Sequence, residues 1–170
     1  RMHSVIDTVE GDCAGAAGLV LTGTGKFFCS GLNVEKFVTM TEQDMPRFGV
    51  AMLGFMRRLV SLPIPTVAAI NGHAFAGGAF VALGCDYRIM RADKGWICTS
   101  EVDVGVPIGD PMMGLLKAKL SPQIAREAAL TGKRYTAKEA LAVGMVDAIS
   151  DQDSLLDNAT ALAGSMAGKE

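Results

Sequence analysis

Two short apolar runs, each enclosed by residues that break helices, constrain the fold more than any other feature of the sequence. The first is 18–23 (GLVLTG), and the second is 66–70 (TVAAI), which follows Pro63 and Pro65. Runs that are this short and apolar on both faces are typical of buried strands in a parallel sheet. Three further segments predict strands: 85–90, 95–100 and 144–149.

The segments between these runs carry helical signals. Thr41 with Asp44, and Thr136 with Glu139, have the spacing of a helix N-terminal cap, and Pro63 ends the long helix that the first pair begins. We expect helices at 1–10, from 41–44 to 62, at 79–84, 111–119, 122–131 and 137–143, and from Asp151 or Asp153 onward. Alternating strands and helices predict an α/β fold with βα units around a mostly parallel sheet, in one domain over residues 1–170.

Composition excludes several classes of function. The net charge of −2 and the pI near 5.7 argue against a nucleic-acid partner, and no apolar run approaches the ~20 residues of a membrane span. Only two histidines and no CxxC pair are present, so a metal site is not expected. We expect free thiols in a reducing intracellular compartment at the four scattered cysteines, Cys13, Cys29, Cys85 and Cys98.

Two glycine-rich segments, 23–33 and 71–78, each follow a buried strand and precede a helix. Glycine lets the backbone approach a ligand, and a helix N-terminus offers free N–H groups. The alternative is that these glycines only make tight turns. Neither segment has the lysine of a GxxxxGK[ST] phosphate loop, and neither contains GxGxxG.

Four ordered segments carry a resemblance to a known family. They are 26–33 (KFFCSGLN), 65–86 (PTVAAINGHAFAGGAFVALGCD), 100–105 (SEVDVG) and 130–147 (LTGKRYTAKEALAVGMVD). Together they resemble the crotonase (enoyl-CoA hydratase/isomerase) family over nearly the whole chain. The resemblance implies a ββα spiral core without the N-terminal strands and C-terminal helices that family members have, so we expect the sequence to be truncated at both ends.

The resemblance also implies the site residues. The main-chain N–H groups of Leu32 and Gly77 would form an oxyanion hole around the thioester oxygen of an acyl-CoA substrate. Coenzyme A is then part of the substrate, no separate cofactor is expected, and a homotrimer is the assembly that the family implies. The resemblance places the substrate along Cys29, Ser30, Gly31, Asn33, Gly72, His73, Ala74, Phe75, Ala76 and Phe80.

Phe80 and Glu101 distinguish between the reactions of the family. Family hydratases carry two glutamates, one of them at the position of Phe80, whereas this chain retains only Glu101. A single base can remove a proton from C2 and return it to C4. Within the family, the chain therefore resembles most the Δ3,Δ2-enoyl-CoA isomerases of fatty acid β-oxidation. We expect an apolar pocket, formed partly by Phe80 and residues 105–113, to raise the pKa of Glu101.

Several alternatives remain open at this point. Hydration or another acyl-CoA chemistry of the same family would reuse the same oxyanion hole, and a degenerate domain would only bind acyl-CoA. Glu101 could be a surface acid at a strand end, and His73 could have a structural role. The sequence does not separate peroxisome, mitochondrion and bacterial cytoplasm.

Overall fold

The computed structural model describes residues 2–12, 17–37 and 39–168, and its centre is a four-stranded sheet. Its strand order is β1 (Leu19–Thr22), β3 (Thr66–Ile70), β5 (Tyr87–Arg91) and β7 (Ala148–Ser150), and every neighbouring pair is parallel. All five residues of β3 are buried. The predicted buried, parallel strands are therefore confirmed, although β7 begins at Ala148 instead of at 144.

A second sheet was not expected from the sequence. It has the order β2 (Phe27–Cys29), β4 (His73–Phe75) and β6 (Ile97–Cys98), again with parallel pairs. The segments 23–33 and 71–78 are therefore not wholly loops, and the parallel strands that the sequence predicted are divided between two sheets. Three residues are too few to show an alternating pattern, and these strands are defined by their neighbours.

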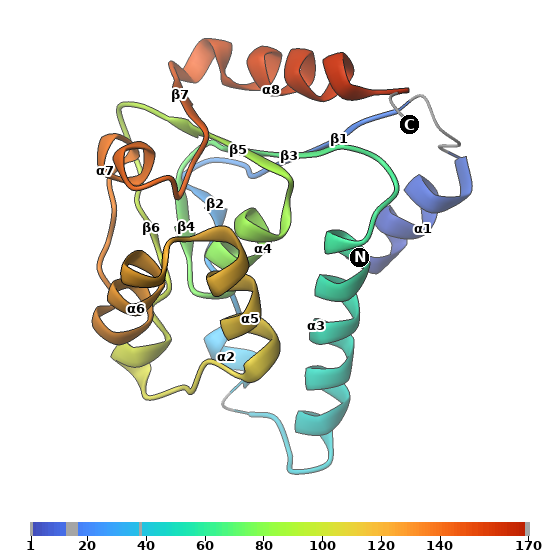
Figure 1. Cartoon of the computed structure of the whole chain (residues 1–170). Helices are drawn as coiled ribbons and strands as arrows, with labels where there is room; N and C mark the ends of the chain where they lie inside the picture. The colour runs from blue at the N-terminus through green and yellow to red at the C-terminus, as the bar shows by residue number, and fades with distance from the viewer. Residues whose placement is uncertain (1, 13–16, 38, 169–170) are drawn as a thin grey trace.

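The chain alternates between the two sheets. β1, β3 and β5 lie in the first sheet, and each is followed directly by β2, β4 or β6 in the second. A helix then returns the chain to the first sheet after β2 and after β4. This repeated strand–strand–helix unit winds the chain into the expected ββα spiral (Figure 1).

Two helices cover the first sheet from opposite sides (Figure 1). α8 (Gln152–Met166) packs Leu155, Ala159 and Ala163 against a cluster that includes Val67 of β3. α4 (Gly77–Gly84) lies in the interior, and its residues from Gly78 onward are buried. Burial on all sides explains why α4 has no polar face, and its start at Gly77 is two residues earlier than predicted.

The remaining helices surround this core. They are α1 (Met2–Asp12), α2 (Val34–Phe37), α3 (Asp44–Val60), α5 (Asp110–Lys119), α6 (Pro122–Thr131) and α7 (Ala137–Ala142). The predicted cap of α7 forms: the Thr136 hydroxyl accepts from Glu139 N, and the Glu139 carboxylate accepts from Thr136 N. At α3, Thr41 and Asp44 hydrogen-bond each other, but the N-cap residue is Gln43, whose side chain forms no capping bond. α2 was not predicted, because four residues are too few for a periodic pattern.

Arg88 ties β5 to the segment before β7. Its side chain, 6% exposed, forms an ion pair with Asp147 at 2.8 Å and donates to Met145 O and Cys85 O, each at 3.0 Å. A buried guanidinium needs such partners, because an unpaired charge is costly in the interior. Arg88 thus fixes the far edge of the first sheet.

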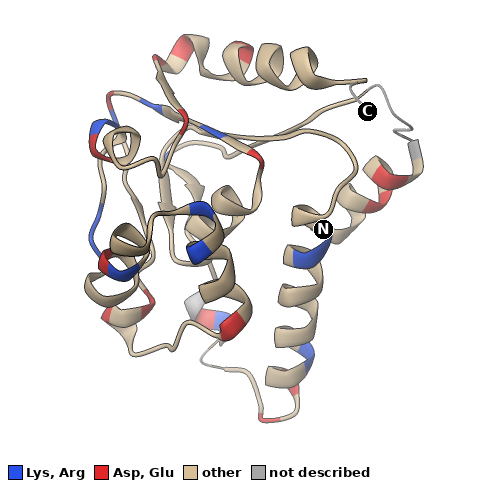
Figure 2. Ribbon diagram, in the orientation of Figure 1, with Lys and Arg blue, Asp and Glu red and all other residues tan. Residues whose placement is uncertain are grey.

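The cysteines and the charged residues follow from this architecture. Cys85 and Cys98 are buried free thiols and Cys29 is half-buried, while Cys13 lies outside the described residues. Burial raises the pKa of Cys85 to about 12. Lys and Arg are interspersed with Asp and Glu over the ribbon (Figure 2). Across the described part of the chain, every helix is too short or too polar to cross a membrane.

Candidate active site

Three segments that the sequence analysis singled out follow the three adjacent strands of the second sheet. Leu32 comes three residues after β2, Gly77 two residues after β4, and Glu101 three residues after β6. Because these strands are parallel neighbours, their carboxyl ends lie at the same edge. Ligands of α/β proteins commonly bind at such an edge. The fold therefore gathers residues that are up to 69 positions apart in the sequence.

The two glycine-rich segments touch each other at this edge. Gly31 has a φ of +84°, and a Cβ built there would lie 3.0 Å from both Gly77 N and Phe75 O. A Cβ built on Gly77 would in turn lie 4.0 Å from Leu32 N. A side chain at Gly31 would crowd the facing backbone, whereas a Cβ on Gly77 would make ordinary van der Waals contacts, so Gly31 is the glycine that this close approach requires.

The amides of Leu32 and Gly77 are both available to a ligand. Neither N–H donates a hydrogen bond to another described residue, whereas Ala79 N and Phe80 N donate to Ala76 O. Ala76 has a φ of +49°, a conformation that alanine rarely adopts, and it turns the chain directly into α4. Gly77 N is thus the first free N–H group of a buried helix, where the helix dipole is positive.

Glu101 is the first residue of a short 3₁₀ helix, η1 (Glu101–Val104). Its Oε2 atom is buried and accepts no hydrogen bond from any residue that the structure describes. Burial raises the pKa of Glu101 above its ordinary value of 4.5, and a hydrogen bond from backbone opposes this to a smaller extent. An unpartnered carboxylate oxygen with a raised pKa is suited to taking up and releasing a proton.

The position of η1 is set by contacts with α6. Asp103 approaches the end of α6, where a Cβ built on Gly132 would lie 2.9 Å from its Oδ1. The backbone closes over η1 through a hydrogen bond from Val106 N to Glu101 O at 3.0 Å. The strand end predicted at Glu101 is therefore a helical turn, which directs this side chain differently from an extended strand.

Phe80 lies one turn into α4 and is 3% exposed. It belongs to the main hydrophobic core, against which Met112 and Met113 of α5 also pack. The benzyl side chain occupies apolar space at a position where a carboxylate would have to be desolvated. Among the residues expected at this site, Glu101 is consequently the only carboxylate, and His73 and Cys29 are the other titratable side chains.

His73 lies at the other end of β4. Its ring is 8% exposed and packs against the rings of Phe27, Phe75 and Trp96, with centroid distances of 5.3, 4.9 and 5.1 Å. Its pKa is lowered, first by burial and then by nearby positive charges that include Lys26. A neutral imidazole in an aromatic cluster fits the structural role that the sequence left open.

The other expected substrate-binding residues are divided between the surface and the core. Ser30 and Asn33 are exposed, and the Asn33 carboxamide accepts from Lys36 N at the start of α2. Ala74 is fully buried, so its side chain faces the core, and Gly72 precedes β4. Within residues 2–12, 17–37 and 39–168, no cluster of His, Cys, Asp or Glu side chains could hold a metal ion.

The family model for enoyl-CoA hydratase/isomerase matches residues 2–170. Enoyl-CoA delta isomerase 3 of Arabidopsis thaliana is 34% identical, over 98% of this chain and 73% of its own length. The peroxisomal enoyl-CoA delta isomerase 2 of the same plant is 33% identical, over 85% of this chain and 62% of its own length.

Solved structures agree with the sequence relatives. The apo structure of an enoyl-CoA isomerase from Mycobacterium tuberculosis superposes with a TM-score of 0.89 at 28% identity, over 99% of this chain and 72% of that one. An enoyl-CoA hydratase from Mycobacterium ulcerans gives a TM-score of 0.86 at 34% identity, over 99% and 73% of the two chains. The two-sheet spiral, the paired glycine segments and these matches lead to one conclusion: the chain belongs to the enoyl-CoA hydratase/isomerase family.

Proposed function

We propose that this chain carries the catalytic core of an enoyl-CoA isomerase that moves the double bond of a 3-enoyl-CoA to the 2 position. The observation that carries the proposal is the carboxylate of Glu101, whose buried Oε2 atom has no hydrogen-bond partner among the described residues, at the edge where two free backbone amides meet. Relatives named as enoyl-CoA delta isomerases support the same reaction. The chain covers 61–73% of their lengths, so the activity of the whole protein is part of the proposal.

In this mechanism the amides of Leu32 and Gly77 form an oxyanion hole. Removal of a proton from C2 places negative charge on the thioester oxygen, and two N–H groups fixed by the backbone stabilise that charge without reorganisation. One such donor contributes about 3–4 kcal/mol to transition-state stabilisation. The close contact of Gly31 with Gly77 supports this role, because it fixes the distance between the two amides.

Glu101 is the proposed proton shuttle. Its carboxylate removes the proton from C2, the electron pair moves through the enolate, and the same group returns a proton to C4 while the C2–C3 double bond forms. The raised pKa of Glu101 favours both steps, because it makes the carboxylate a stronger base while the protonated group can still return the proton. Fatty acid β-oxidation is the pathway that this reaction would serve.

Phe80 favours isomerisation over hydration. Hydration needs a group that activates water and a group that protonates carbon. The buried phenyl ring of Phe80 supplies neither and fills the space beside α4 with apolar surface. Hydration is the second candidate reaction, since relatives named as hydratases and a carnitinyl-CoA dehydratase at 36% identity are also found.

The test compares two substrates. With 3-hexenoyl-CoA we expect conjugated 2-enoyl thioester to accumulate, and with 2-hexenoyl-CoA we expect no hydration. Glu101→Gln should lower kcat by at least about 100-fold, the usual contribution of a general base. Asp157→Asn on the exposed side of α8 should retain wild-type kcat.

Each other outcome selects another function. Hydration of 2-hexenoyl-CoA without conversion of 3-hexenoyl-CoA would contradict the one-base argument. Retained binding of both thioesters without turnover would identify a domain that only binds acyl-CoA. We also propose a homotrimer, which light scattering of the purified protein would reveal as three times the mass of one chain.

A further inference from the structure

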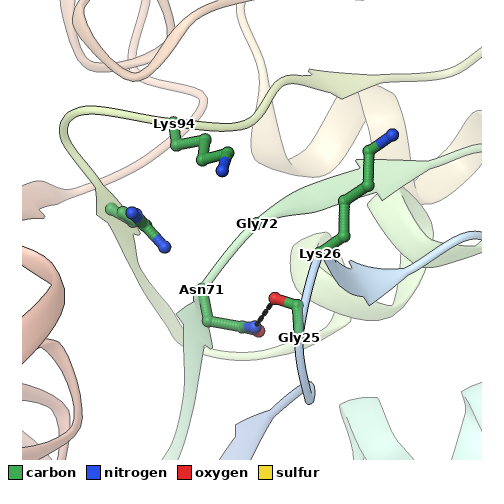
Figure 3. A pocket seen from close by; sticks show the side chains of 6 residues that line it. Gly25, Lys26, Asn71, Gly72 and Lys94 are labelled. Atoms are coloured by element: carbon green, nitrogen blue, oxygen red, sulfur yellow. Dashed lines mark hydrogen bonds between the residues drawn. The ribbon is translucent and has the colours of Figure 1, made fainter.

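A cavity of about 490 Å³ lies away from the proposed active site. It is lined by Gly25, Lys26, Asn71, Gly72, Arg91 and Lys94 (Figure 3). In the figure Lys94 and Lys26 flank the Gly72 segment from opposite sides. Gly72 is the only one of these residues that was named individually as a substrate contact, although Gly25, Lys26 and Asn71 belong to the glycine-rich segments 23–33 and 71–78.

The cavity has the location of a ligand site in α/β proteins. Its lining residues follow or end the adjacent parallel strands β1, β3 and β5, at the point where the chain crosses to the second sheet. The crevice outside the carboxyl ends of parallel strands is where such folds commonly bind ligands. Gly72 and Gly77 are separated by β4, which corresponds to roughly 15 Å of extended chain. The cavity therefore lies at the opposite end of the second sheet from Gly77.

The lining carries an excess of positive charge. Within the described part of the chain, neither Lys26 nor Lys94 forms an ion pair with a carboxylate, whereas Arg91 is paired with Asp93 at 2.6 Å. Asp93 also interacts electrostatically with Lys94, so the three cationic side chains of the lining share one nearby carboxylate and an excess of positive charge remains. Their field reaches the neighbouring ring of His73, whose pKa both lysines help to lower.

The floor of the cavity is preorganised. The Asn71 carboxamide oxygen accepts from Gly23 N at 2.9 Å, and its nitrogen donates to Gly25 O at 3.2 Å (Figure 3). These two hydrogen bonds between the Asn71 side chain and the loop hold the segment before Lys26 in place. A Cβ built on Gly25 would meet no atom within 4 Å, so the space above this floor is open.

We propose that this cavity binds the diphosphate group of a small phosphorylated molecule, at a site separate from the thioester site. Lysine binds phosphate as a point charge, and two lysines facing one cavity match the charge of a diphosphate. The group could come from free pyrophosphate or from a nucleoside diphosphate. Trp96 and Phe27, 40% and 37% exposed beside His73, offer aromatic surface on which a base could stack.

Trp96, the only tryptophan of the chain, lies two residues after Lys94 and reports on the site. Its fluorescence, excited at the long-wavelength edge of indole absorption where the nucleotide base absorbs little, is followed while sodium pyrophosphate or ADP is added at constant ionic strength. We expect saturable changes with both probes. Tighter binding of ADP would identify a nucleoside diphosphate as the ligand, and equal binding would identify the diphosphate group alone.

A double variant, Lys26→Gln with Lys94→Gln, should raise the Kd for pyrophosphate at least about tenfold, since charge-assisted hydrogen bonds are lost. The matched control removes two exposed lysines elsewhere, Lys117→Gln with Lys138→Gln, and should leave Kd unchanged. Equal weakening in both double variants, or no saturation at constant ionic strength, would overturn the proposal.

Turnover of 3-hexenoyl-CoA separates this site from the proposed active site. Pyrophosphate that competes with the thioester, with the competition lost in Lys26→Gln/Lys94→Gln, would mean that the cavity holds part of the substrate, and the separate site would be refuted. Absence of isomerase activity refutes the proposed function only, because pyrophosphate binding is measured without acyl-CoA.

Discussion

Replacing Gly31 by alanine tests whether the two glycine segments form one rigid unit. The residue has a φ of +84°, and its new Cβ would lie 3.0 Å from Gly77 N and 3.2 Å from the Ala76 Cβ. A non-glycine residue in the left-handed region costs about 1–2 kcal/mol. The contacts are with backbone and with a short side chain, so they cannot be relieved by rotating a flexible group.

We therefore expect Gly31→Ala to lower the free energy of unfolding by about 1–3 kcal/mol. For a chain of this length that corresponds to a fall in Tm of about 2–12 °C. Because Gly77 N must move to relieve the contact, the isomerase kcat should fall by about 100-fold, the effect of losing one oxyanion donor. Urea denaturation and the 3-hexenoyl-CoA assay measure the two effects.

Gly114→Ala is the matched control. Gly114 is exposed on α5, and a Cβ there meets nothing within 4 Å. Alanine in a helix should stabilise the protein by about 0.5–1 kcal/mol and leave kcat unchanged. If Gly31→Ala changes stability by less than about 0.5 kcal/mol and keeps wild-type kcat, the two segments do not form a rigid unit.

Three further predictions address the core, a helix cap and pH. Arg88→Met should cost about 2–4 kcal/mol in urea denaturation, because it removes the ion pair with Asp147 and leaves Met145 O without a partner, whereas the exposed Arg126→Met should cost less than about 0.5; equal effects would contradict the bracing role. Thr136→Ala should lower stability by about 1 kcal/mol, and Thr136→Ser should retain the cap, as thermal unfolding of both variants would show. Burial raises the pKa of Glu101 above 4.5 in the folded state. Ionisation of this carboxyl therefore lowers the free energy of unfolding at a pH above the raised pKa, and this loss of stability disappears below about 4.5, where the group is protonated in both states. Glu101→Gln should therefore be more stable than the wild type at pH 8 and equally stable at pH 4, and a constant difference between the two pH values would count against a raised pKa.

Much of the fold was present in local sequence patterns. The apolar run 66–70 predicted β3 with its bounds, and the Thr136–Glu139 spacing predicted the cap of α7. These predictions succeeded because apolar runs, caps and breakers act over a few residues. The short strands β2 and β4 were missed, since strands of three residues are stabilised by neighbouring strands and not by their own composition.

The candidate site, like the fold, could be predicted from the sequence only in part. The sequence by itself determined which residues stand in the four family-like segments, including Glu101 and the absence of a carboxylate at Phe80. Only the tertiary structure decided that Gly31 contacts Gly77, that the Oε2 atom of Glu101 is buried with no partner among the described residues, and that Lys26 and Lys94 line one cavity. The physical reason is that burial, electrostatic fields and contacts between backbones depend on distances across the two sheets. Those distances are fixed only when parallel strands from distant parts of the chain pair side by side.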